Sequence, residues 1–232
     1  MRKISFVTGI MCLLALMAAA QEVPRGEVFL GYSYVRVATG SQVNAFNNNG
    51  GLGEAQVNLN EYLSLVAELG GFVAGNVSIR GPELSSLDQT YFTYQFGPRI
   101  TWRKLGRIAP FGHFLIGGAH ESRSFAVPNV LIPPGAVVPP GVTAEVNPQT
   151  TRFRTSQNAY AMTIGGGFDV NISRRFGVRP FQLDYLPSHF SPFNIPGLST
   201  IGVNNNTNWQ NNIRYSAGLV FRFGQDVGPN TQ

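Results

Sequence analysis

The chain has 232 residues, of which 12% are charged and 12% aromatic, with 27 glycines and a single cysteine. This length allows one large all-β domain or two small ones. The formal charge is +5, but the basic residues form no basic helix or stripe, and we therefore exclude a nucleic-acid-binding protein.

The N-terminus has the pattern of a secretory signal peptide. The basic residues Arg2 and Lys3 precede a mostly apolar run from Ile4 to Met17, and Ala18–Ala20 fits the small-residue rule for cleavage. We predict a signal peptide over residues 1–20, because the apolar run is too short for a transmembrane helix. The only cysteine, Cys12, lies inside it, so the exported chain has no disulfide.

After residue 20, apolar and polar residues alternate with a period of two, and no stretch shows a sustained helical period. We predict eight strands, at about 27–38, 50–60, 63–74, 88–103, 107–121, 157–172, 176–187 and 211–223. Short connections alternate with long connections rich in Asn, Pro and Gly. This places the tight turns at one rim and the long loops at the other, as in an up-and-down barrel.

The last strand raises the choice between a soluble sandwich and a membrane barrel. Its aromatic row, from Tyr215 to Phe223, would fill the core of a sandwich. In an outer-membrane barrel the same row faces lipid and Arg222 faces the interior. The barrel is favoured by strands longer than those of soluble sheets, by polar groups on their second face, and by aromatic residues near their ends, such as Tyr91 and Trp102.

A barrel of eight strands encloses an interior that side chains just fill, so we expect no open pore. Carboxylates on the inner face then need cationic partners, because an unpaired buried charge is costly. We predict an interior polar network of Glu68, Arg99, Asp169, Asp184 and Arg222, with Arg179 as a further candidate partner, and leave open which of them pair.

Residues Ser216 to Phe223 read polar-x-Gly-x-x-aromatic-x-aromatic. This pattern resembles the assembly signal of the eight-stranded outer-membrane β-barrel family typified by the OmpA transmembrane domain and OmpX. The resemblance covers residues 27–223 and implies that Ser216, Gly218, Phe221 and Phe223 are read by the outer-membrane assembly machinery. We expect the barrel over residues 21–224 and a short periplasmic tail over 225–232, too short for a peptidoglycan-binding domain.

Few residues point to catalysis. His189 and Ser191 resemble the His-x-Ser pair of outer-membrane lipid A deacylases, but no Glu follows them, and only Glu121 or Glu145 could reach them from a neighbouring loop. The alternation puts His113 and His120 on opposite faces of one strand, which argues against a two-histidine metal site. We predict no enzyme, no cofactor and no metal.

The sequence thus predicts an integral barrel of the outer membrane of a Gram-negative-type bacterium, with a structural or surface-interaction role. Its expected partners are outer-membrane lipid and lipopolysaccharide, the assembly machinery, and a surface ligand bound by the long loops. A narrow passive channel and a lipid-modifying outer-membrane enzyme are the alternatives.

Overall fold

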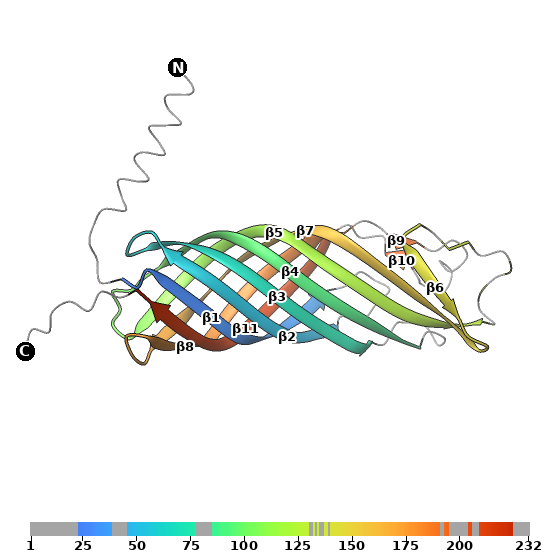
Figure 1. Ribbon diagram of the computed structural model, residues 1–232, viewed down its shortest axis with the longest axis horizontal. Helices are drawn as coiled ribbons and strands as arrows, with labels where there is room; N and C mark the ends of the chain where they lie inside the picture. Colours follow the sequence, from blue (N-terminus) through green and yellow to red (C-terminus); the bar gives the residue numbers. More distant parts are fainter. Residues whose placement is uncertain are drawn as a thin grey trace, which may run out of the picture.

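The computed structural model describes residues 23–38, 46–77, 85–129, 132, 134, 137–138, 140–190, 193–194, 204–205 and 209–224. Almost all of them lie in strands and the turns that join these strands (Figure 1). The strands are β1 (Gly26–Ala38), β2 (Phe46–Asn58), β3 (Leu63–Val77), β4 (Ser85–Thr101), β5 (Ile108–Pro128), β6 (Val142–Val146), β7 (Thr150–Asn171), β8 (Phe176–His189), β9 (Phe193–Asn194), β10 (Asn204–Asn205) and β11 (Trp209–Phe223).

Eight of these strands close into one antiparallel barrel. Their order is β5-β4-β3-β2-β1-β11-β8-β7, and a β5–β7 pairing completes the ring. The first and last strands of the chain meet from Gly26↔Phe223 to Ala38↔Asn211, so both ends of the barrel sequence lie at the same rim. This is the predicted fold class, with the eight predicted strands in the predicted up-and-down order.

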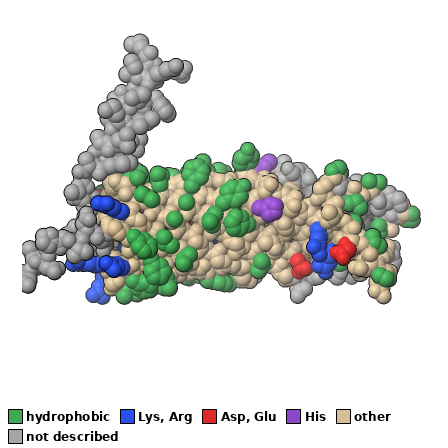
Figure 2. Space-filling view, in the orientation of Figure 1, with side chains coloured by type: hydrophobic (Ala, Val, Ile, Leu, Met, Phe, Trp, Pro, Cys, Tyr) green, Lys and Arg blue, Asp and Glu red, His purple; other side chains and the backbone are tan. Residues whose placement is uncertain are grey.

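The two faces of the wall differ as the alternation predicts. The interior-facing rows carry the buried polar and charged side chains. The outer face carries large apolar side chains that are 42% to 64% exposed, among them Leu30, Val57, Leu65, Leu69, Tyr94, Phe96, Ile116, Ile164, Leu183 and Leu219. On the face shown in Figure 2, hydrophobic side chains cover the middle of the barrel, and charged side chains lie towards its two ends. The aromatic Tyr91 is an exception to the expected outer girdles, because it points inward and is buried.

The region between the fifth and the next barrel strand differs from the prediction. We expected a long loop over about 122–156, but β5 continues to Pro128 and β7 already begins at Thr150. The two strands pair without a break from Ile108↔Val170 to Pro128↔Thr150, and β6 pairs with the far end of β7. They form an extension beyond the barrel, visible at the right of Figure 1. Alternation continues there, with Phe125 and Val127 on the buried face.

A β-bulge interrupts β8 at Pro180. On one side, Ser216 pairs with Gln182 and Gly218 with Arg179; on the other, Phe168 pairs with Phe181 and Val170 with Val178. In its pairing with each neighbouring strand, β8 therefore has one residue more than that neighbour. A proline is tolerated at a bulge, and the extra residue reverses the alternation. Arg179 and Gln182 consequently both face the interior.

The proposed signal peptide and the tail over 225–232 lie outside the described residues. Within the described ranges, no helix is long and apolar enough to cross a membrane.

The outer face allows a direct test of which surface meets lipid. Leu69 is 57% exposed and Ile164 is 55% exposed, and they lie six and seven residues from the short-turn ends of β3 and β7, in the middle of the apolar band. Replacing either by Arg should lower the free energy of folding into lipid vesicles by about 2 to 4 kcal/mol, because a guanidinium would enter hydrocarbon. Urea titration of folding in vesicles measures it. Val137→Arg, in the connection beyond the barrel, is the control; an equal loss there would contradict the assignment.

Candidate functional site

The middle of the interior holds a cluster of ion pairs that spans the barrel. Both Arg99 Nη2 and Arg179 Nη1 donate to Oε2 of Glu54, at 2.6 and 2.7 Å. Arg99, Glu54 and Arg179 come from β4, β2 and β8, no two of which are neighbours in the sheet. The bonds therefore cross the lumen instead of running along its wall.

A second group of bonds crosses at the same level. Arg214 on β11 donates to both carboxylate oxygens of Glu68 on β3, each at 2.6 Å. It also donates to Oδ2 of Asp184 at 2.8 Å. The other oxygen of Asp184 lies 2.8 Å from Nε2 of His113, whose Nδ1 lies 3.0 Å from Arg99. One continuous network thus links both groups.

Further contacts hold the guanidinium groups of this network in place. Arg179 Nε donates to Asp169 at 2.7 Å. Its guanidinium lies 4.2 Å from the ring centre of Phe29, and those of Arg179 and Arg99 each lie 4.3 Å from Phe111. Cation–π contacts of this kind are stronger away from water. Bonded and stacked in this way, Arg99, Arg179 and Arg214 are almost fully buried inside the barrel.

Arg222 lies in a separate cluster at the rim with the short turns. Its Nε donates to Glu27 at 3.1 Å, and Arg103 donates to the same carboxylate at 2.8 Å. Asn58 also donates to Glu27, at 2.9 Å. The structure therefore brings Glu68, Arg99, Asp169 and Asp184 into one network but places Arg222 in another.

Besides His113, three members of the central network are not among the predicted site residues. Arg214 lies an even number of residues before Arg222, on the same face of the last strand. Following the alternation from Ser216 back to residue 214 identifies it as an interior residue. Glu54 lies on the polar face of its strand by alternation, but alternation identifies no partner for it. Arg179 was considered only as a possible addition, because simple alternation places it outside until the bulge at Pro180 is known.

An apolar layer lies above the ion pairs, towards the rim with the long loops. The rings of Phe72, Tyr91 and Phe190 pack in sequence with centres 6.0 and 6.3 Å apart. All three are buried, as are Val35 and Leu186 in the same cluster. The interior thus contains a charged layer and, next to it along the barrel axis, an apolar layer.

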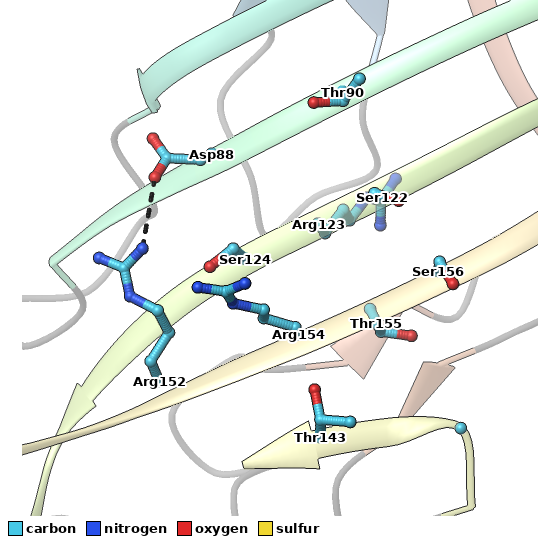
Figure 3. A pocket seen from close by; sticks show the side chains of 11 residues that line it. Asp88, Thr90, Ser122, Arg123, Ser124, Thr143, Arg152, Arg154, Thr155 and Ser156 are labelled. Carbon is cyan, nitrogen blue, oxygen red and sulfur yellow. Dashed lines mark ion pairs between the residues drawn. The ribbon is translucent and has the colours of Figure 1, made fainter. Parts of the chain in front are cut away.

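The extension carries an open groove of about 500 Å³ (Figure 3). Arg123, Arg152 and Arg154 line it, together with Asp88 and with hydroxyl groups from Thr90, Ser122, Ser124, Thr143, Thr155 and Ser156. Arg152 lies 3.9 Å from Asp88, and Arg154 lies 3.9 Å from Glu145; all four side chains are at least 42% exposed. Arg123 pairs with Glu121 at 2.7 Å, so each of the three arginines has an acid nearby, and the groove combines guanidinium groups with carboxylates and hydroxyl groups.

The sheet register fixes the height of this groove. Thr90 stands two residues from Phe92 on β4, and Ser122 stands two residues from His120 on β5. Residues two apart share a face of a strand. Phe92 is exposed on the outer face. The hydroxyl groups of Thr90 and Ser122 therefore lie on the outer wall, just beyond the aromatic residues on the side of the long loops.

The candidate catalytic residues do not come together among the described residues. His189 lies against the ring of Trp209, with ring centres 4.9 Å apart. Glu121 is buried and accepts from Gln89, and Glu145 lies on the exposed strand β6. Ser191 lies outside the described residues. His113 is inside the barrel and His120 outside, and the described residues hold no group of three potential metal ligands.

The structure gives one residue of the predicted assembly signal a packing role. A Cβ at Gly218 would collide with the carbonyl oxygen of Leu30 and with Cα of Gly31 across the β1–β11 seam. Ser216 faces inward and shares a 2.7 Å hydrogen bond with Ser33 on β1. Phe221 and Phe223 face outward, and Phe221 makes an edge contact with Phe176 at 5.6 Å. Whether the assembly machinery reads them stays a prediction.

A closed eight-stranded barrel with an apolar exterior and a charged interior defines an outer-membrane β-barrel. No protein-family model matches the chain, and no curated protein matches it. Among solved structures, Neisserial surface protein A is 9% identical, with a TM-score of 0.50 over 85% of this chain and 97% of that one.

Two further outer-membrane proteins resemble the chain. Ail, the attachment invasion locus protein of Yersinia pestis, is 14% identical over 86% of this chain and 99% of its own, with a TM-score of 0.48. OprG from Pseudomonas aeruginosa is 10% identical over 87% and 97%, with a TM-score of 0.44. At these identities the shared property is the fold.

Removing the carboxylate of Glu54, which Arg99 and Arg179 share, tests how much the central network contributes to the free energy of unfolding. Glu54→Gln leaves Arg99 and Arg179 buried without their common counter-charge. The free energy of unfolding should fall by about 3 to 5 kcal/mol, as for other broken buried pairs. Urea unfolding followed by tryptophan fluorescence measures it.

The matched control is Glu61→Gln, which removes a carboxylate whose partner, Lys104, is exposed at the rim. An exposed pair contributes little, so its unfolding curve should stay close to that of the unaltered chain. Similar curves for the two variants would show that the interior pairs add no specific stability.

Proposed function

We propose that this protein is a non-enzymatic barrel of the outer membrane with a surface-interaction role, carried out by the groove and connections beyond the barrel. The observation that supports this most directly is the set of ion pairs across the lumen, from Arg214 to Glu68 and from Arg179 to Glu54. A channel needs a continuous polar path, whereas here guanidinium groups bridge opposite walls beneath an apolar layer. The separation of His189 from Glu121 and Glu145 speaks against a deacylase.

The proposed partner of the groove is lipopolysaccharide, through its phosphate groups and sugars. The groove lies on the outer wall beyond the exposed aromatic residues, at the height of outer-leaflet head groups. Arg152 and Arg154 provide guanidinium groups that suit phosphate, and the surrounding hydroxyl groups suit saccharides. Their carboxylate partners lie 3.9 Å away, beyond hydrogen-bonding distance, so a phosphate would gain bonds that these acids do not make.

Because side chains close the lumen, we expect the protein not to conduct ions. The folded chain, reconstituted in planar bilayers, should show no stepwise conductance, because both interior layers obstruct ions. Single-channel recording measures this, with a barrel of known conductance as the positive control. Reproducible conductance steps would instead favour the passive channel.

The groove predicts charge-dependent glycolipid binding. The double variant Arg152→Gln/Arg154→Gln should bind fluorescent lipopolysaccharide in detergent roughly tenfold more weakly, if each lost charge-assisted bond contributes about 1 kcal/mol or slightly less. The control Arg36→Gln/Lys104→Gln removes the same charge outside the groove and should bind normally. Equal weakening in both variants would argue against a role for the groove.

The proposed assembly signal predicts a defect in cells. Phe223→Ala should accumulate as unfolded chain in the periplasm, because the final aromatic residue of the signal is missing. Heat-modifiable migration of membrane-extracted protein reports the folded fraction. Leu105→Ala, an exposed turn residue at the same rim, is the control and should assemble normally.

A further inference from the structure

Cations dominate the rim that carries the short turns. The turns at 102–107 and 172–175 contain five of them, Arg103, Lys104, Arg107, Arg174 and Arg175. The third short turn, at 59–62, contributes one acid, Glu61. Figure 2 shows Lys and Arg side chains at this end of the visible face, separated from the opposite end by the hydrophobic middle. The excess is far larger than one carboxylate can neutralise.

Part of this charge is neutralised within the chain. Arg103 pairs with Glu27 at 2.8 Å, and Lys104 pairs with Glu61 at 3.3 Å. The other three cations are exposed, and across the described ranges no ion pair involves the guanidinium groups of Arg107, Arg174 or Arg175. They therefore remain available to an external anion.

The three arginines lie in one sector of the rim. The amide of Asn171, at the end of β7, donates to the carbonyl of Arg107 at 2.7 Å, which joins the two basic turns. The amide of Arg222 donates to the carbonyl of Arg175 at 2.9 Å, on the far side of β8. The sheet thus gathers three positive charges at the ends of β5, β7 and β8.

Apolar side chains in the same turns place this sector at the membrane surface. Trp102 is 52% exposed, Leu105 63%, Ile108 49% and Ile172 62%. Trp102, Ile108 and Ile172 continue the outward rows of β4, β5 and β7, which face hydrocarbon further up the barrel. Tryptophan beside Arg and Lys is typical of the boundary between acyl chains and head groups. The cations therefore stand at the depth of lipid phosphates.

We infer that Arg107, Arg174 and Arg175 form a binding site for the head groups of anionic phospholipids in the leaflet at the short-turn rim. The inference rests on the proposed membrane-spanning barrel, in which this rim faces the periplasm. It is independent of the groove at the opposite end, where Arg152 and Arg154 each have a nearby acid. An anionic diacyl lipid fits both the cationic and the apolar side chains of this sector. Its phosphate would contact the guanidinium groups, and its acyl chains would lie beside Trp102, Ile108 and Ile172.

Native mass spectrometry of the folded full chain, released from detergent with equal amounts of phosphatidylglycerol and phosphatidylcholine, tests this site. The unaltered chain should retain phosphatidylglycerol preferentially. In Arg107→Gln/Arg174→Gln/Arg175→Gln, that preference should fall by roughly tenfold or more, since each cation contributes separately to anionic lipid binding. The control Arg36→Gln/Lys104→Gln removes two exposed cations that already have partners in the chain, Asn47 and Glu61, and that belong to neither proposed site; it should keep the preference.

A Lys triple variant at residues 107, 174 and 175 preserves the charge and should retain the preference. Folding of every variant is verified by heat-modifiable migration. A folded, unaltered chain without preference for phosphatidylglycerol would overturn the inference and leave the barrel intact, whereas failure to enter membranes would overturn the proposed function itself. Equal loss in the control variant would also overturn the inference, as would binding of the chain to purified peptidoglycan but not to phosphatidylglycerol.

Discussion

The structure depends on one constraint, the pairing of every backbone amide and carbonyl group within a sheet that has no edge in the membrane. Hydrocarbon offers these groups no alternative partner, so a strand sequence can span it only by closing on itself. The seam between β1 and β11 performs this closure over the whole length of β1. Gly218 makes it possible locally, since a side chain there would strike the backbone of the facing strand.

Closure has a consequence for the interior, which becomes a narrow space isolated from bulk water. Charges in such a space must be paired, because desolvation of an unpaired ion is far more costly than desolvation of a bonded one. Three arginines and four carboxylates meet this demand with His113 between Arg99 and Asp184. Replacing all of them by apolar residues could give a similarly stable barrel, so we interpret the network chiefly as a means of fixing strand register.

The sequence predicts the barrel well because its signal is periodic. Alternation over eight segments is enough to define strands, faces and rims without knowledge of any contact. Alternation cannot identify partners across the lumen, since Arg214 and Glu68 are separated by 146 positions and lie on strands that are not neighbours. It also fails where one residue is inserted, and the bulge at Pro180 is the reason that Arg179 faces inward. The extra lengths of β5 and β7 alternate as well, but they flank a connection rich in Pro and Gly, and the sequence therefore predicts a long loop there.

Those extra lengths decide how far the protein reaches. A strand of 22 residues, such as β7, is roughly 70 Å long, and at a tilt of about 40° it rises some 55 Å. The apolar band of such barrels is only about 25 Å tall. The far ends of β5 and β7 therefore stand clear of the acyl chains by roughly 30 Å, about the thickness of a whole hydrocarbon core. A binding partner at the cell surface would therefore contact a rigid, hydrogen-bonded pair of strands and not a flexible loop. Little conformational entropy would be lost on binding.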